Sequence, residues 1–196
     1  MSGGPWPNVR SVTHQTTRAV GTVASIRVYP VRSMGGVEHT SADVGATGLA
    51  GDRAATVVGD DGRAVRGKDA PALRSVRPTG DAGADAATVS ALLGRPVRVV
   101  GDADAADGQA AVHLVSTAAL ARAEAGQVPE GCSAEDPRAN LVLELSGDDD
   151  ERAWVGRVLH VGDAVLEVTR TPKHCLGIYA EVRHAGRVSV GDPVLL

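Results

Sequence analysis

The sequence of 196 residues has no phenylalanine, and its aromatic side chains are limited to two tryptophans and two tyrosines. Because hydrophobic residues still make up 43% of the chain, the core must be built mainly from valine, leucine and alanine. No run approaches the ~18 apolar residues that cross a bilayer, so we expect no membrane span. The N-terminus also lacks the continuous apolar stretch of a secretory signal.

The chain has little charge of either sign in excess, with 20 basic and 24 acidic residues and a net charge of −4. A general nucleic-acid binder is usually basic, so this balance argues against nucleic acid as a partner. Nearly all of the basic residues are arginines, which hold oxyanions in a planar two-pronged grip that lysine lacks. A GC-rich genome would give the same bias without any functional meaning.

Cysteine is also scarce, and Cys132 and Cys175 are the only two. Without a CxxC pair, the chain is not expected to hold a structural zinc ion or an iron–sulfur cluster by itself. No two histidines stand at helical zinc-ligand spacing. Two isolated cysteines are typical of a reducing compartment, so we expect a cytoplasmic protein.

The pattern along the chain predicts a poorly ordered lead-in over residues 1–20, rich in Gly, Pro, Ser and Thr, and then a single domain over 21–196. Apolar, β-branched runs predict many short strands. They lie at 22–29, 37–44, 54–58, 63–66, 97–100, 139–145, 157–161, 164–169 and 176–182, with a closing run from 188.

Two short helices are expected between these strands. Asp85 is predicted to cap the first, over 86–93, and Gly94 to end it. Ser116 is predicted to cap the second, which would run through Ala125. Many short strands with few helices predict a mainly β domain, either a barrel or a barrel-like sandwich.

Cys175 is the strongest candidate for chemistry. It lies in a predicted loop beside Arg170, Lys173 and His174, and positive neighbours favour the reactive thiolate. The alternative is a small buried thiol with a packing role. Cys132 lies between Glu130 and Glu135, whose charges oppose ionisation, so we expect it to have no role.

A second group of candidates could hold an oxyanion or phosphate. Arginine forks with Ser and Asn donors suit such a ligand, and these residues lie at predicted strand ends and turns. Each of them could instead be a solvated surface residue, and Asp52 could simply brace its turn. The group comprises Arg32, Ser33, Arg53, Arg138 and Asn140.

Several segments, taken in order, resemble the MOSC proteins, named for the molybdenum cofactor sulfurase C-terminal domain. The similarity extends from about residue 21 to residue 196. The segments are VYPVRS (28–33), GLAGDR (48–53), DDGR (60–63), DPRANLVL (136–143), PKHC (172–175) and GRVSVGDPV (186–194).

The resemblance implies a MOSC-like β-barrel with a few short helices and a molybdenum–pterin cofactor, molybdopterin. It implies Cys175 as the molybdenum ligand, and a soft thiolate suits a metal already held by sulfur. By the same resemblance, a further set of residues would bind the pterin and its phosphate: Arg32, Ser33, Arg53, Arg138, Asn140 and His174. His174 replaces an arginine that is frequent in the reducing enzymes of this family, and it is only partly charged at neutral pH.

The expected function is an oxidoreductase that reduces N-hydroxylated small molecules, with Cys175 as the catalytic ligand and a separate protein as electron donor, as in the amidoxime-reducing enzymes. The chain is shorter than the mitochondrial members of that group. A second possibility is a non-catalytic cofactor carrier, or a sulfur-transfer module that uses a Cys175 persulfide. Pyridoxal phosphate is not expected, since a sulfurase carries it on another domain. A β-barrel with a degenerate site is the third possibility.

Overall fold

The computed structural model describes residues 17–101, 111–132, 135–147 and 149–196. Most of the lead-in predicted for residues 1–20 therefore lies outside the described residues. Within them, the first strand begins at Ala19.

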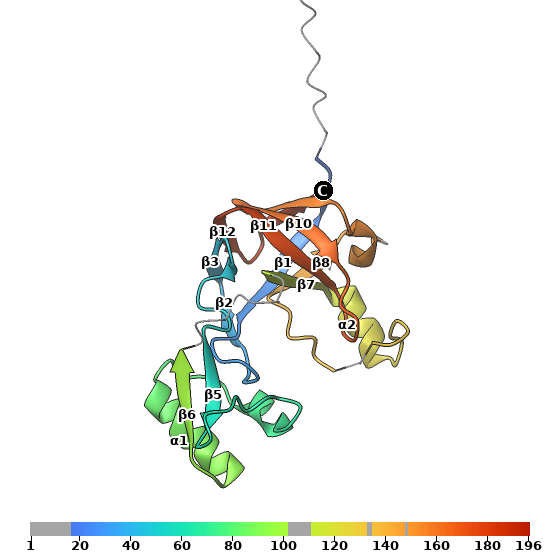
Figure 1. Cartoon of the computed structure of the whole chain (residues 1–196). Coiled ribbons are helices and arrows are strands. Elements are labelled where there is room, and N and C mark those ends of the chain that lie inside the picture. The colour runs from blue at the N-terminus through green and yellow to red at the C-terminus, as the bar shows by residue number, and fades with distance from the viewer. Residues whose placement is uncertain (1–16, 102–110, 133–134, 148) are drawn as a thin grey trace, which may run out of the picture.

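A closed barrel of seven strands forms the larger part of the molecule (Figure 1). Around the barrel the order is β13-β9-β10-β11-β7-β8-β1, and pairing of β13 with β1 closes it. The strands are β1 (Ala19–Val28), β7 (Val112–Ser116), β8 (Leu141–Leu145), β9 (Val158–Val161), β10 (Ala164–Arg170), β11 (Ile178–His184) and β13 (Pro193–Leu195). All of these pairs are antiparallel except β7–β8, which is parallel.

Short strands extend the barrel on one side. The strand β2 (Val37–His39) pairs with the C-terminal end of β1. A separate three-stranded sheet, ordered β12-β3-β4, lies against the barrel and consists of β12 (Gly186–Ser189), β3 (Ser41–Gly45) and β4 (Gly48–Leu49).

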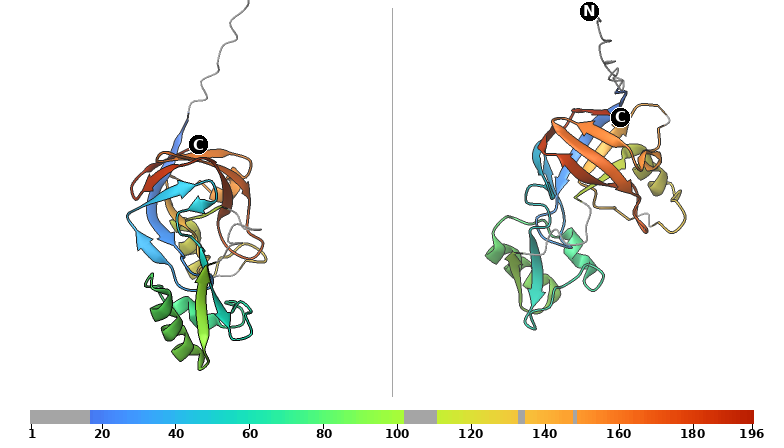
Figure 2. Two further views of the ribbon diagram at one scale, coloured as in Figure 1. Left: turned by 60° about the vertical axis from the view of Figure 1, so that its left-hand side comes forward. Right: turned by 45° about the horizontal axis from the view of Figure 1, so that its top comes forward.

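A smaller lobe projects from one end of the barrel (Figures 1 and 2). It holds the antiparallel pair β5 (Ala55–Gly59) and β6 (Val97–Gly101), the 3₁₀ turn η1 (Pro71–Ser75) and the helix α1 (Ala82–Leu93). The lobe has its own hydrophobic core, which includes Met34, Leu73 and Val89. The sequence did not predict this second core. That residues 21–196 form a single domain stays a prediction.

The barrel interior is filled as the composition requires, mainly by valine, leucine and alanine. In β10, inward positions such as Leu166 and Val168 are fully buried and alternate with partly exposed ones, as expected for a strand with one face on a core. Trp154, in the 3₁₀ turn η2 (Glu151–Trp154), supplies the single large aromatic of this core. The predicted mainly β barrel is confirmed.

Helix caps explain where the two helices begin. Ser116 caps α2 (Thr117–Glu124) by accepting a hydrogen bond from the Ala119 amide, as predicted. The predicted start of α1 is wrong, because Asp81, and not Asp85, accepts the capping bond from the Ala84 amide. Asp85 lies in the first turn and is 3% exposed, and its carboxylate accepts bonds from the Thr79 amide and hydroxyl.

Both helices are short, and no helix within the described ranges is long and apolar enough to cross a membrane. Gly94 ends α1 in the left-handed conformation, at φ 65°, as predicted.

Two strand predictions need correction. Residues 63–66 form no strand, and β5 takes β6 as its partner; only an isolated bridge joins Val58 to Ala64. The run at 37–44 is divided into β2 and β3. The sequence analysis also missed β7, whose five residues are all buried and therefore carry no alternation to detect.

Gly177 should be essential to the fold of the loop that carries Cys175. Its φ is +83°, and a Cβ there would overlap the Leu114 carbonyl oxygen of β7. We expect Gly177→Ala to lower the free energy of unfolding by about 3 kcal/mol, since strain and overlap add. Gly191→Ala is the matched control, because Gly191 has φ +90° but open space around it. Its expected cost is about 1 kcal/mol from strain alone. Equal losses in denaturant unfolding would contradict this account.

Candidate functional site

Three residues other than glycine have positive φ in the described chain, and all three belong to the predicted oxyanion group. They are Ser33 at 68°, Arg53 at 53° and Arg138 at 58°. A side chain in this conformation costs roughly 1–2 kcal/mol, so it persists only where surrounding contacts hold it. Such strain clusters at ligand-binding sites.

The turn after β4 places Arg53. The Asp52 carboxylate accepts a 2.7 Å hydrogen bond from the Tyr29 amide, and the Arg53 amide donates a 2.7 Å bond to the Tyr29 carbonyl. Arg53 also forms an ion pair with Asp52. Asp52 therefore braces this turn, one of the roles considered for it, and fixes Arg53 beside the end of β1.

Arg138 is placed by the segment before β8. Its amide donates a 2.8 Å hydrogen bond to the Asp136 carboxylate, and its guanidinium donates to the Met34 carbonyl. One further bond joins the two arginines, because the Arg53 guanidinium donates to the Arg138 carbonyl at 3.4 Å.

Tyr29 lies between the two arginines in the contact network. The guanidinium carbons of Arg138 and Arg53 lie 4.4 and 5.5 Å from the centroid of its ring, within the range of cation–π attraction. The Tyr29 hydroxyl donates to the Ala139 carbonyl at 3.4 Å, and the residue is 2% exposed. Burial first, and then the charge of Arg53, lower the pKa of Arg138. The site therefore holds two cations at close range, a condition that a bound anion would relieve.

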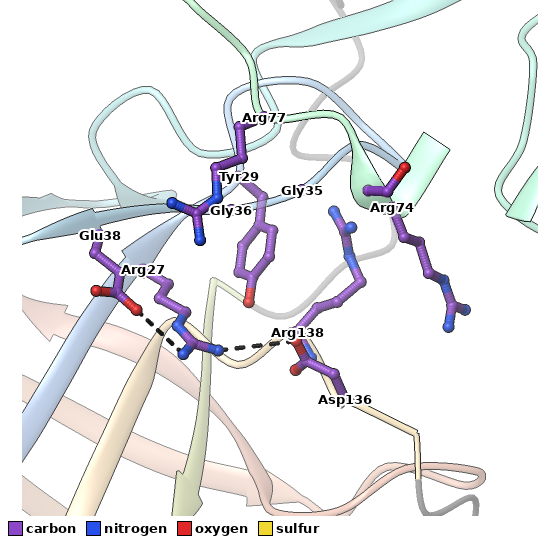
Figure 3. A pocket seen from close by; sticks show the side chains of 10 residues that line it. Arg27, Tyr29, Gly35, Gly36, Glu38, Arg74, Arg77, Asp136 and Arg138 are labelled. Carbon is purple, nitrogen blue, oxygen red and sulfur yellow. Dashed lines mark hydrogen bonds and ion pairs between the residues drawn. The ribbon is translucent and has the colours of Figure 1, made fainter. Parts of the chain in front are cut away.

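A cavity of about 360 Å³ opens beside Tyr29 where the barrel meets the small lobe (Figure 3). Its charged lining comprises Arg27, Arg74, Arg77, Arg138, Glu38 and Asp136. Arg27 is neutralised by Glu38 at 3.2 Å and Asp136 at 3.8 Å, as the dashed lines in Figure 3 show. Arg77 and Arg138 have no carboxylate partner among the described residues.

Cys175 lies in the loop between β10 and β11, half-buried, with its sulfur 3.9 Å from the Tyr179 hydroxyl. Burial raises the pKa of its thiol, more than the Tyr179 hydroxyl and Arg152 lower it. The prediction that flanking cations favour the thiolate is therefore wrong for the free protein. Arg170 is instead stacked over the Tyr179 ring at 5.1 Å, and His174 is exposed, with Nδ1 3.3 Å from the Gly131 carbonyl oxygen.

Tyr179 connects the thiol to the arginines. Burial, and then the neighbouring Cys175, raise the pKa of Tyr179 to about 12, while the charges of Arg53 and Arg170 act in the opposite direction. Its ring meets the ring of His113 edge-on, with centroids 4.6 Å apart. Arg53 thus lies within electrostatic reach of Tyr179, the residue that contacts Cys175.

The other predicted residues have mainly structural contacts. Asn140 is fully buried; its Oδ1 accepts from the His113 amide and its Nδ2 donates to the Arg27 carbonyl. The Ser33 hydroxyl accepts from the Gly67 amide at 2.8 Å, and the Arg32 amide donates to the Ala55 carbonyl. Arg138 alone among the predicted set lines the cavity, and Cys175 does not.

Four residues of this region were not predicted from the sequence: Tyr29, Arg77, His113 and Tyr179. For Tyr29, its position immediately before Pro30 and the VRS segment was an available signal. His113 was missed together with the buried strand that carries it. In the part of the chain that the structure describes, no three His, Cys, Asp or Glu side chains gather as a metal site.

The fold and the site define a barrel protein with an arginine-rich cavity at the edge of a small lobe. The family model of the MOSC N-terminal beta barrel domain matches residues 20–133, more than half of the chain. The chain therefore belongs to the MOSC family. The matched region contains Arg53, but Arg138 and Cys175 lie beyond it.

Two solved structures share the fold. The YUAD protein from Bacillus subtilis superposes with a TM-score of 0.53 at 12% identity, covering 92% of this chain and 97% of its own. A second structure, of a protein described as hypothetical, superposes with a TM-score of 0.50 at 12% identity and covers 95% of this chain and 70% of its own. No curated protein matches the chain significantly. At this identity the likeness concerns the fold alone.

His113 gives a pH dependence of stability. Burial lowers its pKa from 6.5 to about 4 in the folded protein. Between those values the unfolded chain binds a proton that the folded chain does not, so stability falls as the pH is lowered. We expect about 3 kcal/mol to be lost between pH 7 and pH 4 through this group.

The measurement is denaturant unfolding of the wild type and His113→Gln across this range. The variant should be less stable at pH 7 and should lose less stability toward pH 4. His160→Gln, which replaces an exposed histidine of β9, is the control and should follow the wild type. Parallel curves for wild type and His113→Gln would contradict the assignment.

Proposed function

We propose that this protein binds a molybdenum–pterin cofactor and reduces N-hydroxylated small molecules. The observation that carries the proposal is the pair of strained arginines, Arg53 and Arg138, held at Tyr29. The charge of Arg53 also acts on Tyr179, whose hydroxyl contacts the Cys175 thiol. Membership of the MOSC family supports it.

The residues fit the anionic part of such a cofactor. A phosphate accepts paired hydrogen bonds from a guanidinium fork, and no carboxylate of the described residues forms an ion pair with Arg138. Arg77 is exposed at the rim of the same cavity and adds a second cation that forms no ion pair with an acidic side chain in the described part of the chain. We propose that Arg138 and Arg77 bind the phosphate, and that Arg53 keeps the positive potential high and orients the Arg138 backbone.

Cys175 fits the role of metal ligand. Its thiol is half-buried, which leaves it partly accessible while limiting water around a bound metal. Because burial keeps the thiol protonated in the free protein, binding of the metal must release that proton. The Tyr179 hydroxyl lies 3.9 Å from the sulfur, and the buried, neutral His113 packs edge-on against the Tyr179 ring.

When bound, the cofactor would supply two-electron chemistry that removes oxygen from an N–O centre. The chain itself contributes binding and orientation. We propose that electrons come from a separate protein, since two cysteines are too few for an iron–sulfur cluster held by this chain. Two free thiols also fit a reducing compartment, so we propose that the protein acts in the cytoplasm.

A second candidate function is a cofactor carrier or a sulfur-transfer module that forms a persulfide on Cys175. It is favoured by the separation of the two parts of the site, because Cys175 does not line the cavity of the arginines. A carrier would bind molybdenum without reducing N-hydroxylated compounds when a chemical reductant is supplied. A sulfur-transfer module would carry a persulfide in place of the metal.

Molybdenum analysis tests the role of Cys175. Protein purified from cells that make the cofactor should contain stoichiometric molybdenum, and Cys175→Ser should lose it, because a hydroxyl is a much poorer ligand than a thiolate for a soft metal site. Cys132→Ser is the matched control and should keep the metal. Wild-type protein without molybdenum, or a Cys175→Ser variant that retains it, would refute the proposal.

The arginine fork is tested separately. Arg138→Lys keeps the charge but removes the two-pronged geometry, so we expect it to weaken retention of the pterin about 10- to 100-fold, the value of one strong charged hydrogen bond. The control is Arg63→Lys in the small lobe, whose side chain is 89% exposed. Retention is measured as the pterin content after dialysis. Thermal unfolding of each variant shows whether the fold is kept. Equal retention by both variants would show that Arg138 does not bind the cofactor.

A further inference from the structure

The only two cysteines of the chain come together although they are 43 positions apart. The Cys132 thiol donates a hydrogen bond to the Cys175 carbonyl oxygen, with 3.3 Å between sulfur and oxygen. Both residues are half-buried and both are free thiols. The expectation that Cys132 has no role rested on its acidic neighbours in sequence, which do not reveal this contact.

Two contacts and a close approach of the backbones bring the two loops together. Besides the thiol contact, His174 Nδ1 lies 3.3 Å from the Gly131 carbonyl oxygen. A Cβ built on Gly131 would lie 3.8 Å from the Lys173 carbonyl oxygen, so the backbones are in close approach. The turn is closed by the Cys132 amide, which donates to the Pro129 carbonyl at 2.9 Å. The proximity of the cysteines is therefore a property of two packed loops and not of a single flexible side chain.

The local backbone permits the adjustment that a disulfide requires. A disulfide needs Cα atoms about 4.4–6.8 Å apart and a defined torsion about the S–S bond. Gly131 directly precedes Cys132, and neither cysteine lies in a strand or helix. The Cys175 sulfur is 3.9 Å from the Tyr179 hydroxyl, a long contact that rotation of the side chain can break.

A cation lies beside the second thiol. An Arg152 guanidinium nitrogen is 4.0 Å from the Cys132 sulfur, so positive charge is available to balance a thiolate during attack. The Arg152 amide donates a 2.9 Å hydrogen bond to the Asp150 carboxylate, which fixes the start of η2.

We propose that Cys132 and Cys175 form a reversible intramolecular disulfide in response to a peroxide, and that this disulfide blocks the ligand of the proposed cofactor. Hydrogen peroxide oxidises one thiol to a sulfenic acid and releases water. The other sulfur attacks it, the S–S bond forms and a second water leaves. Two S–H bonds are lost, and the peroxide O–O bond takes up the two electrons. A small dithiol reverses the step by thiol–disulfide exchange.

The regulatory part of this inference rests on the proposed function, whereas formation of the bond does not. A sulfur engaged in a disulfide has no thiolate to offer a metal, so the two states of Cys175 exclude each other. Oxidation would therefore prevent loading of the cofactor, and reduction would restore it.

The experiment uses the full chain purified from cells that cannot make the cofactor, treated with hydrogen peroxide under native conditions. We expect the thiols that can be titrated after denaturation to fall from two per chain to none. The monomer mass should fall by two hydrogens, and a non-reducing peptide map should join the peptides of Cys132 and Cys175. Dithiothreitol should restore both thiols.

Two single variants make the result specific. Cys132→Ser and Cys175→Ser should show no mass loss of two hydrogens; each should instead gain oxygen on the remaining sulfur. Sulfinic or sulfonic acids on both cysteines of the wild type, or dimers linked between chains, without the internal bond, would overturn the proposal. Thermal unfolding of each variant shows that the loss of the bond is not due to loss of the fold.

Regulation is measured by loading molybdenum cofactor extracted from another molybdoenzyme. Wild type in which the disulfide has formed should take up no cofactor until dithiothreitol reduces it, while untreated Cys132→Ser should take up as much cofactor as reduced wild type. Uptake by the disulfide form would overturn the regulatory role. If reduced wild type takes up no cofactor but the disulfide still forms, the proposed function fails and the disulfide stands.

Discussion

The site depends on the buried ring of Tyr29, against which two guanidinium groups are held. The Tyr29 backbone is fixed on both sides, so its ring has one position in which to contact the two arginines. The Tyr29 amide donates a hydrogen bond to the Asp52 carboxylate, and the Arg53 amide donates one to the Tyr29 carbonyl. Arg53 and Arg138 adopt positive φ here, which costs roughly 1–2 kcal/mol each, and their contacts with Asp52, Asp136 and Tyr29 hold them in place. Two cations kept at close range over one ring are the basis for the proposal that the site binds negative charge.

The loop that carries Cys175 places its thiol beside partly buried, uncharged groups. Its thiol lies under Tyr179 and beside Cys132, in surroundings that disfavour the charged sulfur until something takes the place of the proton. Local sequence suggested the opposite, because Arg170, Lys173 and His174 are adjacent in the chain. The Arg170 side chain lies over the Tyr179 ring, and the His174 side chain contacts the Gly131 carbonyl. The cation that lowers the pKa of the thiol is Arg152, which is distant in sequence. Sequence neighbours are not the electrostatic neighbours in a loop that folds back on itself.

Much of the fold could be read from the sequence wherever a local rule determines the structure. Strand alternation gave β1 and β10, and a side-chain cap gave α2 at Ser116. These rules failed where tertiary contacts determine the structure. The strand β7 is buried on both faces and shows no alternation. Asp85 is buried and bonded to Thr79, so Asp81 caps α1 instead. For the site, turn and motif residues pointed to Arg53 and Arg138. The partnership of Cys132 with Cys175 arises only from loop packing.

The single parallel pair of the barrel, β7 with β8, has a consequence for how this site could evolve. Parallel neighbours cannot be joined by a tight turn, so the chain must leave the wall and return to the starting end before β8 begins. That excursion carries α2, Cys132, Asp136 and Arg138 on one continuous stretch. Exchanging this one connection between related proteins would replace Arg138 and Cys132 together and leave the barrel wall intact, so the proposed anion contact and the proposed disulfide would change as a unit.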